Sequence, residues 1–395
     1  MKKDKHGFGT KAVHGGEDGG FAFNPASTPI YQTSTFFFGG TGEAGEVQEG
    51  EKEGFIYTRI GNPTVKAFED KMALLEGGEA AVAFSSGMGA VSAVLLEVLR
   101  PGDEVISSSR IYGGSKKFFE NILGSLGCPV KTFVPYENLR RTIPALITPR
   151  TKLIFSETPS NPELSIIDIR LIADLARKHK LLSVIDNTFA TPYLQRPLER
   201  GIDCVLHSAT KYIGGHGDAI GGVVISSKDF ISRLRANTLP NLGACVSPFN
   251  AWLFLRGLKT MHIRMEHHCK TAGKVAELLR AQKKVEEVLY PGLRDHPGHN
   301  IAKRQMSGFG GVLSIRLESG RACRRFVNGL GLCRIGVSLG DAATLVLHPA
   351  SLFAPKATDA GCRKIGLDPT LIRISTGLED AGDIVADLKG ALSAF

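Results

Sequence analysis

The feature that most constrains this chain is a series of short, uniformly apolar runs separated by amphipathic helical stretches. A strand with one face in water alternates apolar and polar residues, whereas a strand covered on both faces does not. The pattern therefore predicts an α/β fold, with a mostly parallel sheet between two layers of helices. The runs are AAVAF (80–84), DEVISSS (103–109), PVKTFVPY (129–136), KLIFSETP (152–159), LLSVIDNT (181–188) and CVLH (204–207).

The two ends of the chain have a different texture. Residues 1–62 are rich in glycine and lack periodicity, and we interpret them as an extended arm that packs on a second subunit. A long helical pattern runs over residues 254–282, followed by three strand-like runs separated by helices. We therefore predict three parts: an arm over 1–62, the large α/β domain over 63–255, and a smaller α+β domain over 256–395.

Composition excludes several classes of protein. The net charge of +9 comes from 48 Lys and Arg against 39 Asp and Glu, but no basic stripe is interleaved with aromatics, so nucleic-acid binding is not expected. No apolar run approaches the ~18–20 residues of a membrane helix, and the start has no apolar signal segment. Seven scattered cysteines without a CxxC pair, and histidine pairs without partner ligands, predict reduced thiols in the cytoplasm and no metal site.

Polar residues stand where the apolar runs end. Ser85–Gly89 follows the first run and opens a helix, so free N–H groups and the helix dipole would face an anion. Asp186 closes the run LLSVID, where a buried carboxylate is costly without a cation or several donors. Asp186 either caps the turn at Asn187 and Thr188 or pairs with a buried cationic nitrogen such as a pyridinium. Ligands bind at this edge of parallel sheets, so we expect a site there.

Lys211 lies in Ser208-Ala209-Thr210-Lys211, 25 residues after Asp186. Desolvation lowers the pKa of such a lysine and makes it a nucleophile. Ser-x-x-Lys also occurs in acyl-transfer enzymes, but their Ser-Asp-Asn and Lys-Thr-Gly elements are missing here. An anion-binding turn, a carboxylate and a lysine together meet the needs of pyridoxal phosphate. Arg373, in LIRISTG, adds a guanidinium, which can bind a substrate carboxylate through two parallel hydrogen bonds.

Longer motifs make the chain resemble the Cys/Met-metabolism family of pyridoxal-phosphate enzymes, of fold type I. The resemblance extends from Thr10 almost to the end. It implies a large cofactor-binding domain, a smaller C-terminal domain, and a tetramer built from dimers that share active sites. The motifs are YTRIGNPT (57–64), SSGMGA (85–90), IYGG (111–114), ETPSNP (157–162), VIDNTFATPY (184–193), HSATKYIGGHGD (207–218), SPFNAWLFLRGLKT (247–260), VSLGDAATL (337–345), HPAS (348–351) and LIRISTGLED (371–380).

The resemblance also implies roles for individual residues. Lys211 matches the lysine that forms a Schiff base with the cofactor, Asp186 the partner of its ring nitrogen, and Tyr112 the tyrosine that stacks on the ring and serves as acid or base. Tyr57 and Arg59 match a pair that reaches the phosphate in the neighbouring subunit's site. The positions that match phosphate-binding residues are Ser86, Gly87, Met88, Ser208 and Thr210. Those that match residues around the substrate carboxylate and the cofactor oxygen are Asn161, Ser338 and Arg373.

The activity implied is that of a carbon–sulfur lyase, with γ-elimination of L-methionine to methanethiol, 2-oxobutanoate and ammonia as the leading reaction. Cystathionine enzymes often carry glutamates where this chain has the apolar Ile56 and Val337. Two positions argue against methionine as the substrate, because Gly114 and Leu239 stand where methionine γ-lyases have a cysteine and a lysine. A cystathionine γ-lyase or γ-synthase, or an O-acetylhomoserine sulfhydrylase that performs γ-replacement, remains the alternative.

Overall fold

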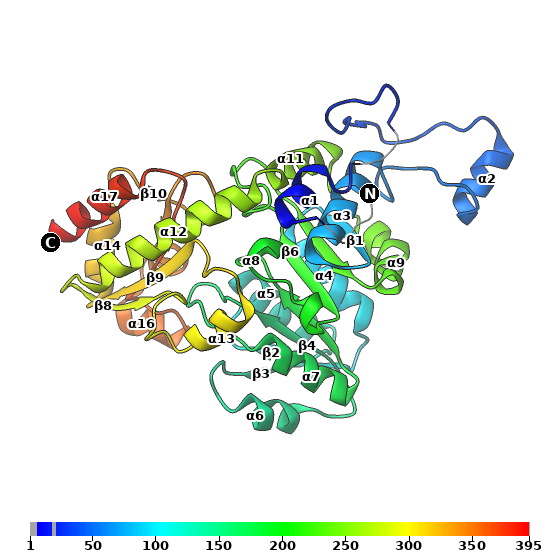
Figure 1. The fold of residues 1–395 in the computed structure, drawn as a ribbon. Helices are drawn as coiled ribbons and strands as arrows, with labels where there is room; N and C mark the ends of the chain where they lie inside the picture. The colour runs from blue at the N-terminus through cyan, green and yellow to red at the C-terminus, as the bar shows by residue number, and fades with distance from the viewer. Residues whose placement is uncertain (1–5, 18–20, 395) are drawn as a thin grey trace.

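The structure is a computed structural model that describes residues 6–17 and 21–394. Residues 1–5 and 18–20 of the predicted arm, and residue 395, lie outside the described part. Two sheets, each with its own helices, make up the body of the molecule (Figure 1). The predicted α/β fold with a mostly parallel sheet and a second, smaller α+β part is confirmed.

The large sheet has seven strands in the order β1-β7-β6-β5-β4-β2-β3. Strands β2 to β6 pair in parallel, and β7 runs antiparallel to both of its neighbours, β1 and β6. The carboxyl ends of the parallel strands therefore meet at one edge. The strands are β1 (Ala80–Phe84), β2 (Glu104–Ser108), β3 (Val130–Phe133), β4 (Thr151–Glu157), β5 (Leu182–Asp186), β6 (Cys204–Ser208) and β7 (Gly222–Ser226).

Helices cover both faces of this sheet. Because successive strand side chains point to opposite faces, Phe84 of β1 packs with one helical layer and Ala83 with the other. The first layer holds α4 (Gly87–Val98), α5 (Gly113–Lys117), η1 (Phe118–Leu123), α9 (Lys228–Ala236) and α10 (Thr238–Leu242). The second holds α3 (Pro63–Glu76), α6 (Leu139–Leu146), α7 (Ile169–His179), α8 (Thr191–Leu194), η2 (Leu198–Arg200) and α11 (Pro248–Leu258).

The smaller sheet has five strands in the order β10-β11-β12-β9-β8. On β12, Ile372 and Ile374 pack against helices, and the intervening Arg373 belongs to the opposite face. The strands are β8 (Val285–Leu289), β9 (Val312–Leu317), β10 (Arg334–Ile335), β11 (Leu345–Leu347) and β12 (Leu371–Ser375). The helices of this part are α12 (Met261–Arg280), α13 (His299–Gln305), α14 (Gly320–Asn328), α15 (Pro349–Phe353), α16 (Asp359–Lys364) and α17 (Ala381–Ser393).

The predicted continuous helix over 254–282 is wrong, because α11 ends at Leu258 and α12 begins at Met261. Gly257 lies so close to Gly214 that a Cβ on it would stand 2.5 Å from the Gly214 carbonyl oxygen. The Gly257 carbonyl then accepts a hydrogen bond from Arg264 Nη2 at 2.7 Å instead of continuing the helical ladder. The break lets α12 leave the large sheet and run along the smaller one (Figure 1).

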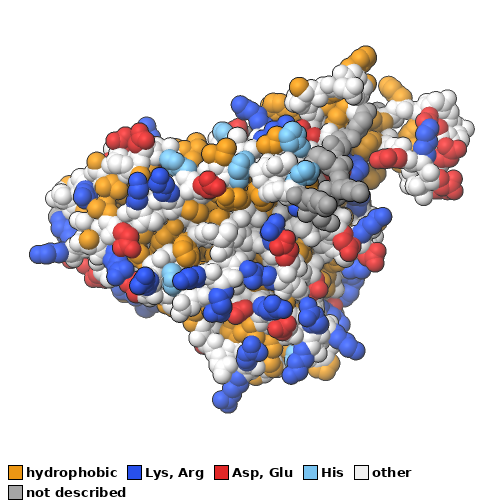
Figure 2. Space-filling model, in the orientation of Figure 1, with side chains coloured by type: hydrophobic (Ala, Val, Ile, Leu, Met, Phe, Trp, Pro, Cys, Tyr) orange, Lys and Arg blue, Asp and Glu red, His pale blue; other side chains and the backbone are white. Residues whose placement is uncertain are grey.

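Two short helices lie in the N-terminal arm: α1 (Phe8–His14) packs on α3 and α12, whereas the segment with α2 (Thr41–Glu49) leaves the body of the molecule (Figure 1). Helix α2 has no buried residue. Phe37 is 97% exposed, and apolar side chains lie open along the arm (Figure 2). In the described part of the chain, none of the helices is both long and apolar enough to cross a bilayer.

Candidate active site

The predicted site residues gather where β4, β5 and β6 end. Glu157 of β4 and Asp186 of β5 are paired in register, and Ser208 is the last residue of β6. Three neighbouring parallel strands thus end in polar side chains at one edge of the sheet, as the sequence predicts. Lys211 lies three residues after the end of β6, and its side chain contacts Ser338, in the part of the chain that contains the smaller sheet.

Lys211 Nζ donates a hydrogen bond to Ser338 Oγ at 3.1 Å. Burial, together with the Arg373 charge, lowers the pKa of Lys211 to about 8, and the Asp186 charge opposes the shift. An amine with this pKa is neutral in about a tenth of the molecules at pH 7, far more often than an ordinary lysine, and the neutral amine is the nucleophile. The sequence argument for a desolvated lysine agrees with this geometry.

The Asp186 carboxylate is bound to the strand edge through Thr188. Its Oδ1 accepts hydrogen bonds from Thr188 N at 3.0 Å and Thr188 Oγ1 at 2.5 Å, and Thr188 Oγ1 accepts one from Ser208 N at 2.8 Å. The turn that the sequence left as an alternative is therefore present. Both bonds fall on Oδ1, so within the described chain Oδ2 has no hydrogen-bond donor. Burial raises the pKa of Asp186, although Thr188 opposes the shift.

The segment predicted to bind an anion joins β1 to α4. Ser86 is the N-cap of α4, and its Oγ accepts a hydrogen bond from Gly89 N at 3.0 Å. A Cβ on Gly87 would stand 2.8 Å from Ser208 Cβ, so this glycine allows the helix start and the end of β6 to touch. Thr210 Oγ1 accepts a hydrogen bond from Gly221 N at 3.1 Å. Met88 Sδ accepts one from Ser115 Oγ at 3.9 Å.

Arg373 lies on β12 and faces this edge from the smaller sheet. Its Nη1 donates to Asn161 Oδ1 at 3.1 Å, and its Nη2 donates to the carbonyls of Val337 and Ser338 at 3.0 and 2.7 Å. Its Nε is buried and has no partner among the described residues. Burial lowers the pKa of Arg373 to about 10, so the guanidinium stays charged at neutral pH. Asn161, Ser338 and Arg373 are thus together, as predicted.

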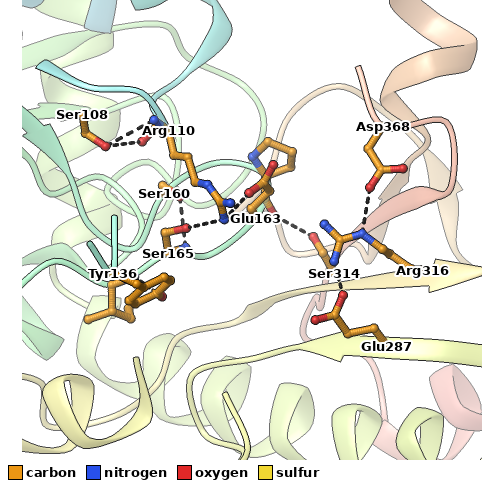
Figure 3. Close-up of polar contacts among 12 residues, drawn as sticks. Ser108, Arg110, Tyr136, Ser160, Glu163, Ser165, Glu287, Ser314, Arg316 and Asp368 are labelled. Carbon is orange, nitrogen blue, oxygen red and sulfur yellow. Dashed lines mark hydrogen bonds and ion pairs between the residues drawn. The ribbon is translucent and has the colours of Figure 1, made fainter. Parts of the chain in front are cut away.

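The loop that carries Asn161 joins β4 to α7 and also contacts the smaller sheet, and Figure 3 shows how it is held. Ser314 Oγ of β9 donates to the Pro162 carbonyl at 2.7 Å. On the other side, Arg110 forms an ion pair with Glu163 and donates to Ser165 Oγ at 3.1 Å. The loop therefore has attachments to both parts of the molecule.

Tyr112 stands just before α5 and is 47% exposed. Its main-chain N donates to Glu157 Oε2 at 2.6 Å, which places the residue beside the strand edge. A Cβ on Gly114 would stand 2.4 Å from the Tyr112 ring, so the ring uses the space that a side chain at position 114 would fill.

Tyr57 and Arg59 lie in the arm and contact each other. The Arg59 guanidinium lies 5.5 Å from the centre of the Tyr57 ring, and Arg59 Nη1 donates to the Pro240 carbonyl at 2.8 Å. In the described residues, neither side chain forms a hydrogen bond with Lys211 or Ser86. Their role in a neighbouring subunit's site stays a prediction.

Sequence reasoning assigned no role to four residues at or behind this edge. Thr188 connects Asp186 to Ser208, and Glu157 binds the main chain on both sides of its strand. Behind them, His207 Nε2 lies 2.8 Å from Glu76 Oε2 in a fully buried pair. Glu157 could have been found, because it ends an apolar run in the same way as Asp186. The pair of Glu76 and His207 gives no signal, since the two are far apart in the sequence.

These residues fit pyridoxal phosphate. The group needs an anion site, a carboxylate opposite a protonated ring nitrogen, and a lysine for its aldehyde. The close approach of Gly87 to Ser208, the open Oδ2 of Asp186 and the low pKa of Lys211 meet these needs. Among the described residues, no group of three or more His, Cys, Asp or Glu side chains is placed to hold a metal ion.

Comparison with known proteins gives the same assignment. A family model described as Cys/Met metabolism PLP-dependent enzyme matches residues 9–393. An L-methionine gamma-lyase of Fusobacterium nucleatum subsp. polymorphum is 45% identical over 395 residues, 99% of each chain. A cystathionine gamma-synthase of Mycobacterium leprae is 42% identical over 388 residues, 98% of this chain and 97% of the other.

One structural relative carries a pyridoxyl group on a lysine. The crystal structure of a putative O-acetylhomoserine (thiol)-lyase from Campylobacter jejuni has a TM-score of 0.93 and 32% identity, covering 98% of this chain and 100% of the other. That protein carries N'-pyridoxyl-lysine-5'-monophosphate. Together with the arrangement around Lys211 and Asp186, these matches show that the chain belongs to the Cys/Met-metabolism family of pyridoxal-phosphate-dependent enzymes.

Proposed function

We propose that this enzyme eliminates methanethiol from the γ-carbon of L-methionine. Methionine and water give methanethiol, 2-oxobutanoate and ammonia. The observation that carries the choice of substrate is Val337, whose carbonyl binds Arg373 and whose side chain is apolar and 62% exposed. An apolar group beside the carboxylate-binding arginine suits a thioether and offers nothing to a distal ammonium group. Relatives of 42–45% identity named L-methionine gamma-lyase support this choice.

The roles of the site residues follow from their positions. Pyridoxal phosphate, when bound, supplies an electron sink for the negative charge that develops at the substrate Cα. Ser86, Gly87, Met88, Ser208 and Thr210 would hold its phosphate. Asp186 would hold the ring nitrogen, and Lys211 would bond to the aldehyde.

The substrate carboxylate binds the Arg373 guanidinium, whose orientation Asn161 and the two carbonyls fix. Lys211 Nζ, in the neutral form that its lowered pKa makes accessible, accepts the α-proton while Ser338 Oγ orients it. Tyr112 Oη gives a proton to the leaving sulfur. Such a proton-transfer group is worth about 10²–10⁴-fold in rate, so Tyr112→Phe is expected to lower kcat by this factor.

The second candidate is γ-replacement on a homoserine ester by sulfide. The observation that favours it is Gly114, where the Tyr112 ring takes the space of the cysteine of methionine γ-lyases. Leu239, in place of their lysine, is buried in the core of the large domain and brings no charge to the site.

A substrate panel separates these candidates. The cofactor-loaded protein is assayed with methionine, homocysteine, cystathionine, cysteine and O-acetylhomoserine, each with and without sulfide, for keto acid and thiol. We expect methionine to be consumed without sulfide. If O-acetylhomoserine with sulfide is the sole reactive combination, the enzyme is a sulfhydrylase. If cystathionine is much the best substrate, the argument from Val337 and Ile56 is wrong.

We propose further that the active unit is at least a dimer, and a tetramer of two such dimers, with sites shared between subunits. The exposed arm supports this proposal. Phe23 and Phe37 are almost fully exposed, and Tyr57, beside Arg59, is 41% exposed. Large apolar side chains exposed on a projecting segment are typical of an interface.

A further inference from the structure

Glu157, at the carboxyl end of β4, is a buried carboxylate that binds main chain on both sides. It is 4% exposed. Its Oε2 accepts a hydrogen bond from Tyr112 N at 2.6 Å and its Oε1 accepts one from Asn161 N at 2.8 Å. Within the described chain these two amides are its hydrogen-bond partners. Burial and then the Asp186 carboxylate raise the pKa of Glu157 well above its usual range, so its position here is costly.

Both amides belong to segments that carry active-site side chains. The Asn161 side chain binds Arg373 Nη1, and Arg373 Nη2 binds the Ser338 carbonyl. The Ser338 hydroxyl in turn accepts the hydrogen bond of Lys211. A single carboxylate therefore joins Tyr112 to a continuous series of contacts that ends at the lysine.

The rest of the loop does not depend on Glu157. Ser314 holds the Pro162 carbonyl, and Arg110 holds Glu163 and Ser165 (Figure 3). Loss of the carboxylate would leave the loop attached to both parts of the molecule. The loss would instead change the positions of Tyr112 and Asn161, whose main-chain N–H groups bind this carboxylate.

We propose that Glu157 is a positioning residue, which sets Tyr112 and Asn161 in place relative to Arg373 and Lys211 without touching the substrate. The inference rests on the proposed function for the roles of Tyr112, Asn161 and Arg373. A carboxyl group suits the task because both of its terminal atoms are oxygens, so it can accept the two N–H groups at once. A glutamine accepts one of them and turns its own NH₂ toward the other.

The test compares Glu157→Gln with Glu104→Gln in the full, cofactor-loaded enzyme. Glu104 is a matched control because it is 2% exposed and begins β2, at the opposite edge of the same sheet. Three properties are measured: circular dichroism of the bound cofactor, affinity for norleucine, and kcat and KM. Norleucine keeps the carboxylate and apolar chain of methionine but has no leaving group.

For Glu157→Gln we expect normal cofactor content, a changed cofactor dichroism, weaker norleucine binding, and a fall in kcat/KM of about 10–100-fold, because small misplacements of reacting groups are costly. For Glu104→Gln we expect lower thermal stability and no change in the three properties. If Glu157→Gln keeps wild-type dichroism, norleucine affinity, kcat and KM, the proposal is wrong.

If Glu157→Gln fails to fold, Glu157→Asp replaces it, because aspartate keeps the charge and withdraws the oxygens by one methylene. The same losses are expected with near-normal stability. Failure of both variants to fold would make Glu157 a structural residue and overturn the proposal. If the wild-type enzyme releases no thiol from methionine, the proposed function fails, but dichroism and norleucine binding still test Glu157.

Discussion

Lys211 and Arg373 both lie where burial disfavours positive charge, yet the consequences for the two residues differ. The pKa of Lys211 falls to about 8, within reach of neutral pH, and that of Arg373 to about 10. The lysine can therefore exchange protons in the working range while the arginine keeps its charge. This difference suits one group to proton transfer and the other to holding a carboxylate.

The low pKa of Lys211 predicts how the cofactor-free protein takes up pyridoxal phosphate. The neutral amine is the reacting form, so the rate should rise with pH, bend at about pH 8 and then level off. For an ordinary lysine, the rate would not level off until about pH 10.4. The rate is followed through the visible absorbance of the bound cofactor, with Lys211→Ala as the control that gains no such band. A rate that still climbs tenfold per pH unit at pH 9 would contradict the assignment.

Glu104 predicts a pH-dependent contribution to stability. Hydrogen bonds from Lys131, Thr148 and Arg150 lower its pKa to about 2. A lowered pKa stabilises the folded state above the ordinary carboxyl value of ~4.3, and this contribution is lost as the pH falls toward the folded value. The gap in free energy of unfolding between wild type and Glu104→Gln should therefore shrink from pH 7 to pH 3. A gap that is constant or widens in acid would show that these ion pairs do not set its pKa.

At the scale of elements, the site depends on how closely β1, β6 and β7 approach. Gly222 begins β7, and a Cβ there would stand 2.2 Å from the Ser86 carbonyl oxygen. Ser86 caps α4, so any shift at Gly222 moves the start of the helix predicted to hold the phosphate. Backbone contact of this kind leaves no flexible side chain to move aside.

Gly222→Ala is therefore expected to destabilise the protein by about 1–3 kcal/mol, as overpacking does, and to weaken cofactor binding. Gly273 is the control: it lies in α12 with nothing within 4 Å of the Cβ position. Gly273→Ala should stabilise the protein by about 0.5–1 kcal/mol and leave cofactor affinity unchanged. Thermal unfolding and cofactor titration measure both quantities. Equal effects of the two substitutions would exclude the close approach as the cause.

The elements with buried apolar runs were predictable from the sequence, and the others were not. The runs at 80–84 and 181–188 contain β1 and β5, because strands covered on both faces show no alternation. Strand β8 escaped prediction because Glu286 and Glu287 interrupt it. Strand β7 follows a glycine-rich segment that hides its pattern. Of the site, Lys211 and Asp186 follow from local chemistry, and Glu157 ends an apolar run in the same way. The contact of Thr188 with Ser208 required knowledge of which strands are neighbours.

At the scale of the whole molecule, the exposed arm supports the proposal that the chain packs against a second copy of itself. Helix α2 buries nothing, and Phe37 is 97% exposed at the end of a segment that leads away from the body (Figure 1). Tyr57 and Arg59 belong to this segment, so they would reach a neighbour's site if the arm packs there. The predicted division of the chain at residues 62 and 255 stays a prediction.

Shared sites predict complementation between two inactive variants. Arg59→Ala removes the arm's contribution and Lys211→Ala removes the lysine. A hybrid dimer has one site with both residues intact, and half of randomly mixed dimers are hybrids, so activity should return to about a quarter of wild type. The mixed sample is assayed after subunit exchange has been verified by mass. Exchange without recovery of activity would show that each site is built from a single chain.

The central claim is that Lys211 performs an elimination on methionine, and product stoichiometry tests it most directly. Cofactor-loaded wild-type protein is incubated with L-methionine and no sulfide, and 2-oxobutanoate, methanethiol and ammonia are measured in the same sample. The account predicts equal amounts of the three from the wild type and none from Lys211→Ala. Methionine left intact by the wild-type enzyme, or turned over equally well by Lys211→Ala, would contradict it.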